Sequence, residues 1–293
     1  MLRRRGLKVE ITEGGGGSNA AANVVGGSAD IAQVSTLNVA ELNAGGQSVS
    51  VIAPTQNGLA MNVIAKKSLT EEAGIRAESS LQQKARILKG RNVGVTDVGG
   101  SSGDLVRFVL SEAGFSEENV NLVQIPSNAG LLSALKEGKV DAIASLSPTT
   151  DKAVVEGFGF PLVVPMRGDL PTKFGAEDFA YVVMMSNDKW VETDPDKAVK
   201  FLRAHQRALD LAEKNPPKAK AAFYQYVSSL GAGNEVGKRV QDAAFQANVD
   251  GIPSEIVPKR KPVQDSLEFF GIADKTSAKD IINLKPAKKA MAG

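Results

Sequence analysis

Gly27-Ser28-Ala29-Asp30-Ile31-Ala32 recurs 111 residues later as Gly138-Lys139-Val140-Asp141-Ala142-Ile143. The same offset aligns Ile52-Ala53-Pro54 with Val163-Val164-Pro165. The order and the spacing of these segments agree in both copies, which favours an internal repeat. Two copies of one supersecondary plan predict two lobes of similar topology, joined by a hinge, with a ligand cleft between them.

Short apolar runs alternate with segments of helical period in both copies. This alternation predicts an α/β fold in which each lobe has a mostly parallel sheet flanked by helices. We expect the strands at residues 7–11, 30–34 and 49–53 in the first copy, and at 120–125, 141–145 and 160–164 in the second.

The second copy opens with a strand at 92–96 and a helix at 104–113 that have no counterpart in the first copy. Only residues 1–6 precede the strand expected at 7–11. The repeat therefore predicts that the first strand of lobe one is missing and that an upstream extension of about 25 residues would restore it. We expect a secretory signal before that extension, because no apolar signal segment follows Met1.

The lobes are not continuous in the sequence. We expect lobe one to consist of residues 1–65 and 180–284, and lobe two of residues 90–179, with a polar helical connector at 66–89. Residues 285–293 are rich in Lys and Ala, and we expect a disordered tail there.

The composition excludes several classes of function. Charged residues make up 23% of the 293 residues and the net charge is +2, so nothing indicates a nucleic-acid partner. The chain has no Cys and a single His205, which lies in a segment of helical period. Thiolate metal sites and cysteine nucleophiles are excluded, and no partner accompanies His205 for a catalytic triad. We expect no metal, no cofactor and no catalysis.

Several segments together resemble the solute-binding proteins of ABC importers, most closely the nitrate/sulfonate/taurine-type branch. They are residues 6–10, 27–32, 88–95, 135–142 and 196–202. The resemblance implies a type II periplasmic binding fold and a periplasmic or extracytoplasmic location, either soluble or lipid-anchored. It also implies a monomer that delivers a small solute to a membrane permease.

The candidate ligand residues follow the expected strands, where loops lead into helix N-termini. In α/β sheets ligands bind at this end of the strands, and helix N-termini favour anions. Most of these loops carry uncharged hydrogen-bonding side chains, which together predict a small anionic solute. For any single residue, capping of a helix is the stronger interpretation, but their paired occurrence in both lobes favours binding. The candidates are Ser18, Asn19, Ser35, Thr36, Gln56 and Asn57 in lobe one, and Gly100, Ser101, Ser102, Ser127, Asn128, Ser147 and Thr149 in lobe two.

Two other classes of function share this two-lobed plan. One is an enzyme similar to the pyrimidine-precursor synthases of thiamine biosynthesis, which depend on a cysteine-rich motif and on histidines. The other is the effector-sensing domain of a transcription regulator, which needs a helix-turn-helix segment. The absence of Cys, the single His and the lack of a helix-turn-helix signature disfavour both.

Overall fold

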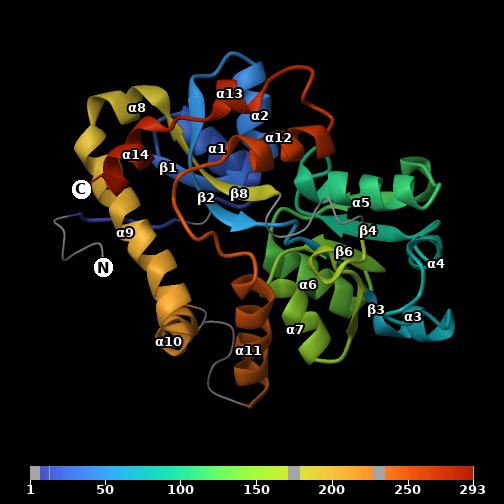
Figure 1. The fold of residues 1–293 in the computed structure, drawn as a ribbon. Coiled ribbons are helices and arrows are strands. Elements are labelled where there is room, and N and C mark those ends of the chain that lie inside the picture. Colours follow the sequence, from blue (N-terminus) through green and yellow to red (C-terminus); the bar gives the residue numbers. More distant parts are fainter. Residues whose placement is uncertain (1–6, 13, 171–178, 227–234, 293) are drawn as a thin grey trace. The chain divides into compact units, whose positions relative to one another are not determined.

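The computed structural model describes residues 7–12, 14–170, 179–226 and 235–292 (Figure 1). The chain forms two compact units, each built from separate stretches of sequence. Unit 1 comprises Met1–Gly58, Ala176–Ala222 and Gly251–Gly293, and unit 2 comprises Leu59–Gly175 and Phe223–Asp250. Residues 223–226 and 235–250, which we expected in lobe one, thus belong to unit 2, and so do the residues of the expected connector.

Unit 1 is built on a three-stranded sheet with the order β1-β8-β2. Its strands are β1 (Ile31–Ser35), β2 (Val49–Asn57) and β8 (Ala180–Asn187). Its helices are α1 (Gly17–Val25), α2 (Thr36–Ala44), α8 (Asp188–Thr193), α9 (Pro195–Lys214), α12 (Arg260–Phe269), α13 (Ala278–Ile281) and α14 (Lys285–Met291), and α10 (Pro216–Tyr226) runs from unit 1 into unit 2.

The expectation of a mostly parallel sheet is wrong for unit 1. The central strand β8 pairs antiparallel with both β1 and β2. β1 and β2 run in the same direction, as the alternation of strands and helices predicts, but β8 separates them. Its alternate residues Val183 and Met185 lie in the core with Val34, Val51 and Leu267. Burial of this apolar face holds the strand in its register.

Unit 2 is built on a five-stranded mixed sheet with the order β5-β4-β6-β3-β7. β4, β5 and β6 are parallel, whereas β3 is antiparallel to both β6 and β7. Figure 1 shows α5 on one face of this sheet and α6 and α7 on the other. The strands are β3 (Asn62–Lys66), β4 (Asn92–Val95), β5 (Asn121–Gln124), β6 (Ala142–Ser145) and β7 (Gly159–Val163). The helices are α3 (Lys67–Glu72), α4 (Leu81–Arg86), α5 (Ser101–Glu112), α6 (Asn128–Glu137), α7 (Thr149–Val155) and α11 (Glu235–Val249), with 3-10 turns η2 (Glu117–Asn119) and η3 (Pro165–Arg167).

The two copies of the repeat have the same order of elements. The run α1-β1-α2-β2 in the first copy corresponds to α6-β6-α7-β7 in the second. In each sheet one antiparallel strand from elsewhere in the chain lies between the two strands of the repeat, giving β1-β8-β2 and β6-β3-β7. The prediction of two units with a common topology is therefore correct for this part of each sheet.

The strand expected at residues 7–11 is not formed. Residues 7–12 have no regular secondary structure, and Ile11 is 76% exposed. β1 pairs with β8 on one side, and within the described ranges no strand pairs with its other side. In unit 2, β4 and β5 extend the sheet beyond β6, the counterpart of β1. In unit 2 the equivalent strand β5 pairs with β4 and not with β6, and residues 7–11 have no counterpart of β4 to pair with among the described residues.

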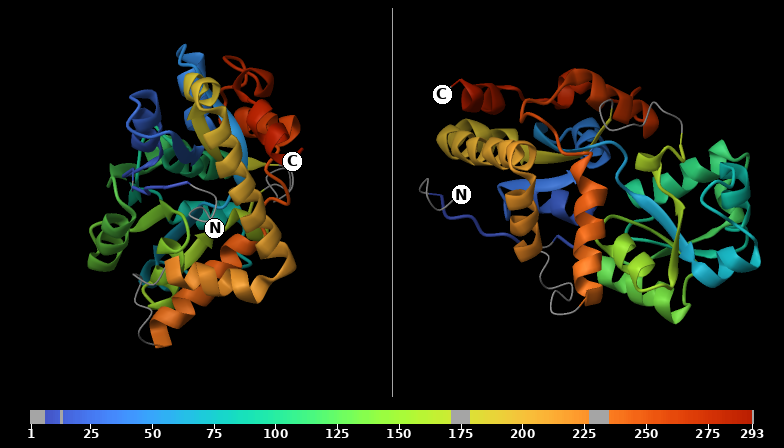
Figure 2. Two further views of the ribbon diagram at one scale, coloured as in Figure 1. Left: turned by 90° about the vertical axis from the view of Figure 1, so that its left-hand side faces the viewer. Right: turned by 60° about the horizontal axis from the view of Figure 1, so that its bottom comes forward.

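The expectation of a disordered tail at 285–293 is also wrong. Residues Lys285–Met291 form α14, with Pro286 at its first turn, where the missing N–H of proline costs nothing. Ala287 and Ala290 are buried against α9, and the carbonyl of Ala290 accepts a hydrogen bond from Arg203 Nε at 3.1 Å. Figure 2 shows α14 alongside α9. The small alanine side chains allow this close packing, which composition alone does not indicate.

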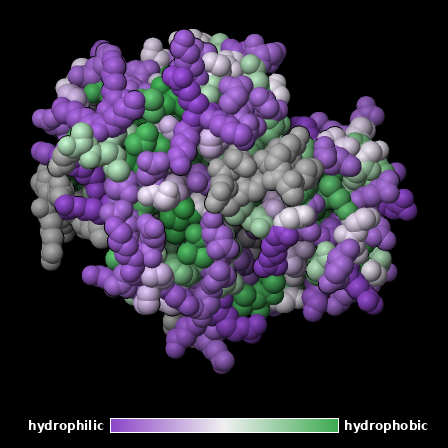
Figure 3. All heavy atoms as spheres, viewed as in Figure 1, coloured by the Kyte–Doolittle hydropathy of each residue, from purple (hydrophilic) through white to green (hydrophobic). Residues whose placement is uncertain are grey.

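The surface is predominantly hydrophilic on the face that Figure 3 shows. Among the described residues, the well-exposed large apolar side chains are Val9, Ile11, Val154, Val236 and Met291. No described helix combines the length and the apolar character that a membrane span requires.

Candidate functional site

In unit 1 the N-termini of α1 and α2 meet through Asn38, a buried residue that the sequence analysis did not single out. Ser35 Oγ donates a hydrogen bond to Asn38 Oδ1 at 2.8 Å, and Asn38 Nδ2 donates to Ser18 Oγ at 3.4 Å. Gly17 permits this approach, because a Cβ atom there would lie 2.5 Å from Asn38 Oδ1. α1 begins at Gly17 with Gly16 as its N-cap, so Ser18 lies inside the first turn of the helix and does not cap it. Ser35 is the N-cap of α2.

The other candidates in unit 1 have mixed environments. The hydroxyl of Thr36 is buried and donates to the carbonyl of Ala180 in β8, so it ties α2 to the sheet. Gln56 is buried and its Nε2 donates to the carbonyl of Asn57 at 3.3 Å. Asn19 is exposed on α1. Thr36 and Gln56 therefore support the local structure, and the structure does not bring Asn19 into the group formed by Ser18 and Ser35.

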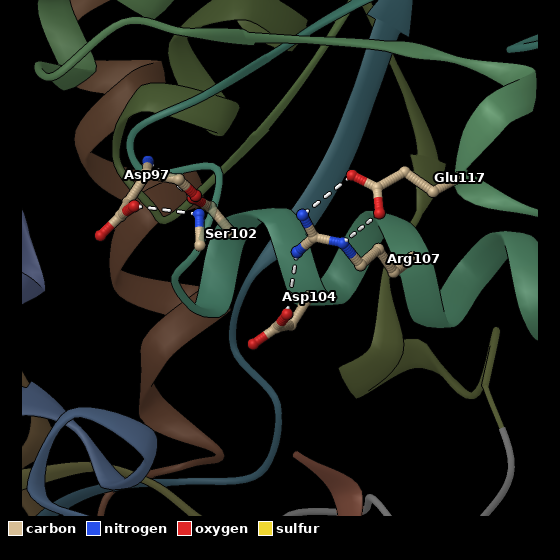
Figure 4. A network of polar contacts seen from close by, with 6 residues as sticks. Asp97, Ser102, Asp104, Arg107 and Glu117 are labelled. Carbon is tan, nitrogen blue, oxygen red and sulfur yellow. Dashed lines mark hydrogen bonds and ion pairs between the residues drawn. The ribbon is translucent and has the colours of Figure 1, made fainter. Parts of the chain in front are cut away.

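In unit 2 the loop before α5 is held together by Ser102 and Asp97 (Figure 4). The buried Ser102 Oγ donates to the carbonyl of Asp97 at 3.0 Å and accepts a hydrogen bond from the Asp97 amide at 3.2 Å. Asp97 Oδ1 accepts a hydrogen bond from the amide of Gly99. Gly100 is the N-cap of α5, and Ser101 is the first residue of the helix and is half-buried. Ser102, the second residue of α5, thus fixes the loop that precedes the helix.

A group of charges lies along α5, just after this loop (Figure 4). Arg107 donates two hydrogen bonds to the carboxylate of Glu117, at 2.8 and 2.9 Å, and a third to Asp104 at 3.0 Å. The hydrogen bond to Glu117 raises the pKa of Arg107 and lowers that of Glu117. Burial raises the pKa of Asp104, against the opposite effect of Arg107. Arg107 therefore joins α5 to η2, and its charge is already engaged by two carboxylates.

A second set of candidates lies at the N-termini of α6 and α7. Ser127 is the N-cap of α6 and accepts a hydrogen bond from the amide of Gly130 at 3.0 Å. Asn128 Oδ1 accepts a hydrogen bond from Ser145 Oγ, at the end of β6. Ser147 Oγ donates to Asp151 Oδ2 at 2.5 Å, and burial raises the pKa of Asp151.

The structure thus shows which of the predicted residues cap helices and which form other hydrogen bonds. Ser35 and Ser127 cap helices, and Thr36, Ser102 and Ser147 hydrogen-bond within the fold. Thr149 is half-buried at the first position of α7.

The sequence analysis missed the buried polar residues Asn38, Asn62, Ser145 and Thr150. The available signal was a polar residue at the end of an apolar strand, as at Ser145 after Ala142-Ile143-Ala144. Within the described ranges, no three His, Asp or Glu side chains are grouped as metal ligands.

His205 lies on α9 in unit 1, where its Nε2 is 3.1 Å from the carbonyl oxygen of Pro54. Burial lowers the pKa of the imidazole, and the contact with Pro54 opposes this only in part. The side chain is therefore held against the backbone of β2.

The buried His205 predicts a specific dependence of stability on pH. The pKa of His205 is lower in the folded protein than in the unfolded chain, so the unfolded chain binds more protons below about pH 6.5. We therefore expect the free energy of unfolding to fall from pH 7 to pH 5.5 more steeply in the wild type than in His205→Gln. Denaturant unfolding at both pH values measures this difference. No other histidine contributes, and the carboxylates are common to both proteins. Equal slopes in the two proteins would contradict the assignment.

The comparisons with known proteins agree with the fold. A model of the NMT1-like family matches residues 1–227. A comparison with curated proteins finds no match. Many solved structures are similar to the chain, and three of them illustrate the likeness. A protein from Bordetella bronchiseptica RB50 has 22% identity and a TM-score of 0.79, with 99% of this chain and 89% of that chain covered.

The other two are binding proteins. The alkanesulfonate-binding protein SsuA of Xanthomonas axonopodis pv. citri, bound to MOPS, has 16% identity and a TM-score of 0.68, with 96% and 87% covered. The periplasmic nitrate-binding protein NrtA of Synechocystis PCC 6803 has 14% identity and a TM-score of 0.69, with 97% and 80% covered. At these identities the likeness shows a common fold, the periplasmic binding fold.

Proposed function

The chain belongs to the NMT1-like family, and we infer that it is the solute-binding component of an ABC importer. In this proposal it binds a small anionic solute outside the cytoplasm, as two lobes close on it, and delivers the solute to the membrane permease as a monomer. It carries out no catalysis and needs no cofactor. Closure requires only that the solute binds the closed state better than the open state.

One observation carries this proposal. Corresponding parts of the two copies of the repeat, namely helix N-termini and the carboxyl ends of β1 and β6, carry uncharged hydrogen-bonding side chains. In unit 1 these side chains are Ser18, Ser35 and Asn38, and in unit 2 they are Asn128 and Ser145. Amide groups at helix N-termini and hydroxyl donors suit the oxygens of a small anion. The sulfonate-binding and nitrate-binding proteins of the same fold have anionic solutes in keeping with this inference.

A catalytic function on the same fold is disfavoured by the environment of His205. The chain has no Cys, and its single imidazole is buried against the carbonyl of Pro54. The enzymes of thiamine biosynthesis that share this plan need a cysteine-rich motif and several histidines. We therefore expect no turnover of any solute that the protein binds. If the protein converts a bound solute and His205→Ala abolishes this conversion, the catalytic function is favoured instead.

Binding of a panel of solutes tests the proposed function. The panel contains nitrate, alkanesulfonates, small carboxylates and pyrimidines, and the measured quantity is the thermal unfolding midpoint. A solute present at about 100 times its Kd stabilises the folded state by about 2.7 kcal/mol, which raises the midpoint of a protein of this size by roughly 5–10 °C. We expect at least one anion to give such a saturable rise, and calorimetric titration of the same solute to confirm it. If none of the four classes raises the midpoint, the proposed function is wrong.

A further inference from the structure

Two buried polar atoms in unit 2 lack a hydrogen-bond partner. Asn62 is 9% exposed and Thr150 is 2% exposed. Among the buried side chains that the structure describes, only Asn62 Oδ1 and Thr150 Oγ1 make no hydrogen bond. Buried polar groups are nearly always satisfied in folded proteins, so two unsatisfied atoms in one unit need an explanation.

The topology places these two residues beside one another. The side chains of Ala153 in α7 and Ile64 in β3 meet, since a Cβ atom on Gly159 would lie 2.8 Å from both. α7 connects β6 to β7, which both run antiparallel to β3, so α7 runs in the direction of β3. One helical turn before Ala153 is Thr150, and two residues before Ile64, on the same face of the strand, is Asn62. The two residues therefore lie near one another at the carboxyl end of β6.

The N-terminus of α6 reaches the same place. Ser145 is paired with Asn62 in the antiparallel ladder, so the two side chains lie on one face of the sheet. Ser145 Oγ donates to Asn128 Oδ1 at 2.9 Å, and Asn128 is the first residue of the ten-residue helix α6. We call Asn62, Asn128, Ser145 and Thr150 the polar cluster. It combines a helix N-terminus, which favours an anion, with two side chains that have hydrogen-bonding capacity left over.

We propose that the polar cluster recognises the solute in unit 2, and that this solute carries a hydroxyl or amino group next to its anionic group. The inference rests on the proposed function and deepens it. Asn62 Oδ1 can only accept a hydrogen bond, whereas the hydroxyl of Thr150 can donate or accept one. Nitrate or an unsubstituted alkanesulfonate offers acceptors alone and leaves Asn62 Oδ1 unpaired. A hydroxyl or amino substituent supplies the missing donor, and a buried acceptor that finds its donor favours that solute over the analogue without it.

Matched pairs of solutes test the proposal. The pairs are 2-hydroxyethanesulfonate with ethanesulfonate, and glycolate with acetate, and the measured quantity is the Kd from calorimetric titration. For at least one pair, we expect the wild type to bind the hydroxylated member roughly five- to tenfold more tightly. Asn62→Leu and Thr150→Val should each reduce this preference to less than about twofold. A preference for the unsubstituted member, or a preference that both variants retain, would overturn the proposal.

The stability of the unliganded protein gives an independent readout. Thr150→Val removes a hydroxyl that makes no hydrogen bond, so its thermal midpoint should equal or exceed that of the wild type. Thr70→Val is the matched control, because the buried hydroxyl of Thr70 donates to the carbonyl of Lys67 at 2.8 Å. This control should lower the midpoint by about 2–4 °C and leave solute binding unchanged.

The two readouts separate the outcomes. If Thr150→Val lowers the midpoint as much as Thr70→Val does, a buried water satisfies the cluster and the proposal is overturned. If the wild type binds none of the four solutes or the rest of the panel, the proposed function fails. In that case the midpoints of the unliganded variants still test, without any solute, whether the hydroxyl of Thr150 lacks a hydrogen-bond partner.

Discussion

Replacement of Lys84 by Ala should destabilise the protein by about 3–5 kcal/mol, because it leaves a carboxylate without its counter-charge. Lys84 is 2% exposed and its ammonium lies 2.7 Å from Asp169 Oδ1. The other carboxylate oxygen of Asp169 accepts a hydrogen bond from the amide of Val164, also at 2.7 Å. The pair therefore joins α4 to the turn that follows β7. The loss is a large part of the roughly 5–15 kcal/mol by which a typical domain is stable.

Denaturant unfolding measures this loss, and two further variants separate charge from volume. Lys84→Met keeps most of the side-chain volume, so any loss it shows reflects the unpaired charge of Asp169. Lys136→Ala is the matched control, because Lys136 pairs with Glu156 at 3.1 Å but is 62% exposed. Exposed pairs contribute about 0–1 kcal/mol. Equal losses in Lys84→Ala and Lys136→Ala would show that burial does not govern the strength of these ion pairs.

Replacement of Phe179 by Ala should cost a similar amount, about 3–5 kcal/mol, through the cavity that it creates in unit 1. Phe179 is fully buried immediately before β8. Its ring meets Phe269 of α12 edge to face, with the ring centroids 5.3 Å apart, and stacks on Tyr181 at 6.3 Å. Truncation removes these contacts and leaves a space that the packed neighbours cannot fill.

The same unfolding measurement distinguishes a cavity from a general loss of apolar surface. Phe179→Leu retains much of the volume and should cost less than half as much as Phe179→Ala. Met291→Ala removes a large apolar side chain that is 47% exposed, and it should change the free energy of unfolding by less than about 0.5 kcal/mol. If Phe179→Leu and Phe179→Ala have equal effects, the aromatic contacts matter more than the volume.

The candidate site could be predicted only in part. The sequence analysis located the loops after the strands, and Ser35, Ser127 and Asn128 do lie at helix N-termini. It could not tell which hydroxyls form hydrogen bonds within the fold and which are left to bind a solute. The hydroxyls of Thr36 and Ser102 donate to the backbone carbonyls of Ala180 and Asp97, and these partners are not visible in the sequence. The sequence analysis gave Asn62 no role, and its unpaired oxygen becomes visible only when Ser145 and Thr150 are placed around it.

The sequence by itself determined the features that depend on local patterns. The repeat and the alternation of apolar and helical segments are enough for the order α1-β1-α2-β2 and its counterpart α6-β6-α7-β7, since side-chain periodicity and capping act over a few residues. Tertiary structure decided what depends on partners distant in the chain. β8 and β3 enter the sheets antiparallel, residues 7–11 form no strand, and α14 is a helix because it packs on α9. The conformation of each of these segments is stabilised by packing against a surface that other parts of the chain provide. No pattern within the segment itself encodes that surface.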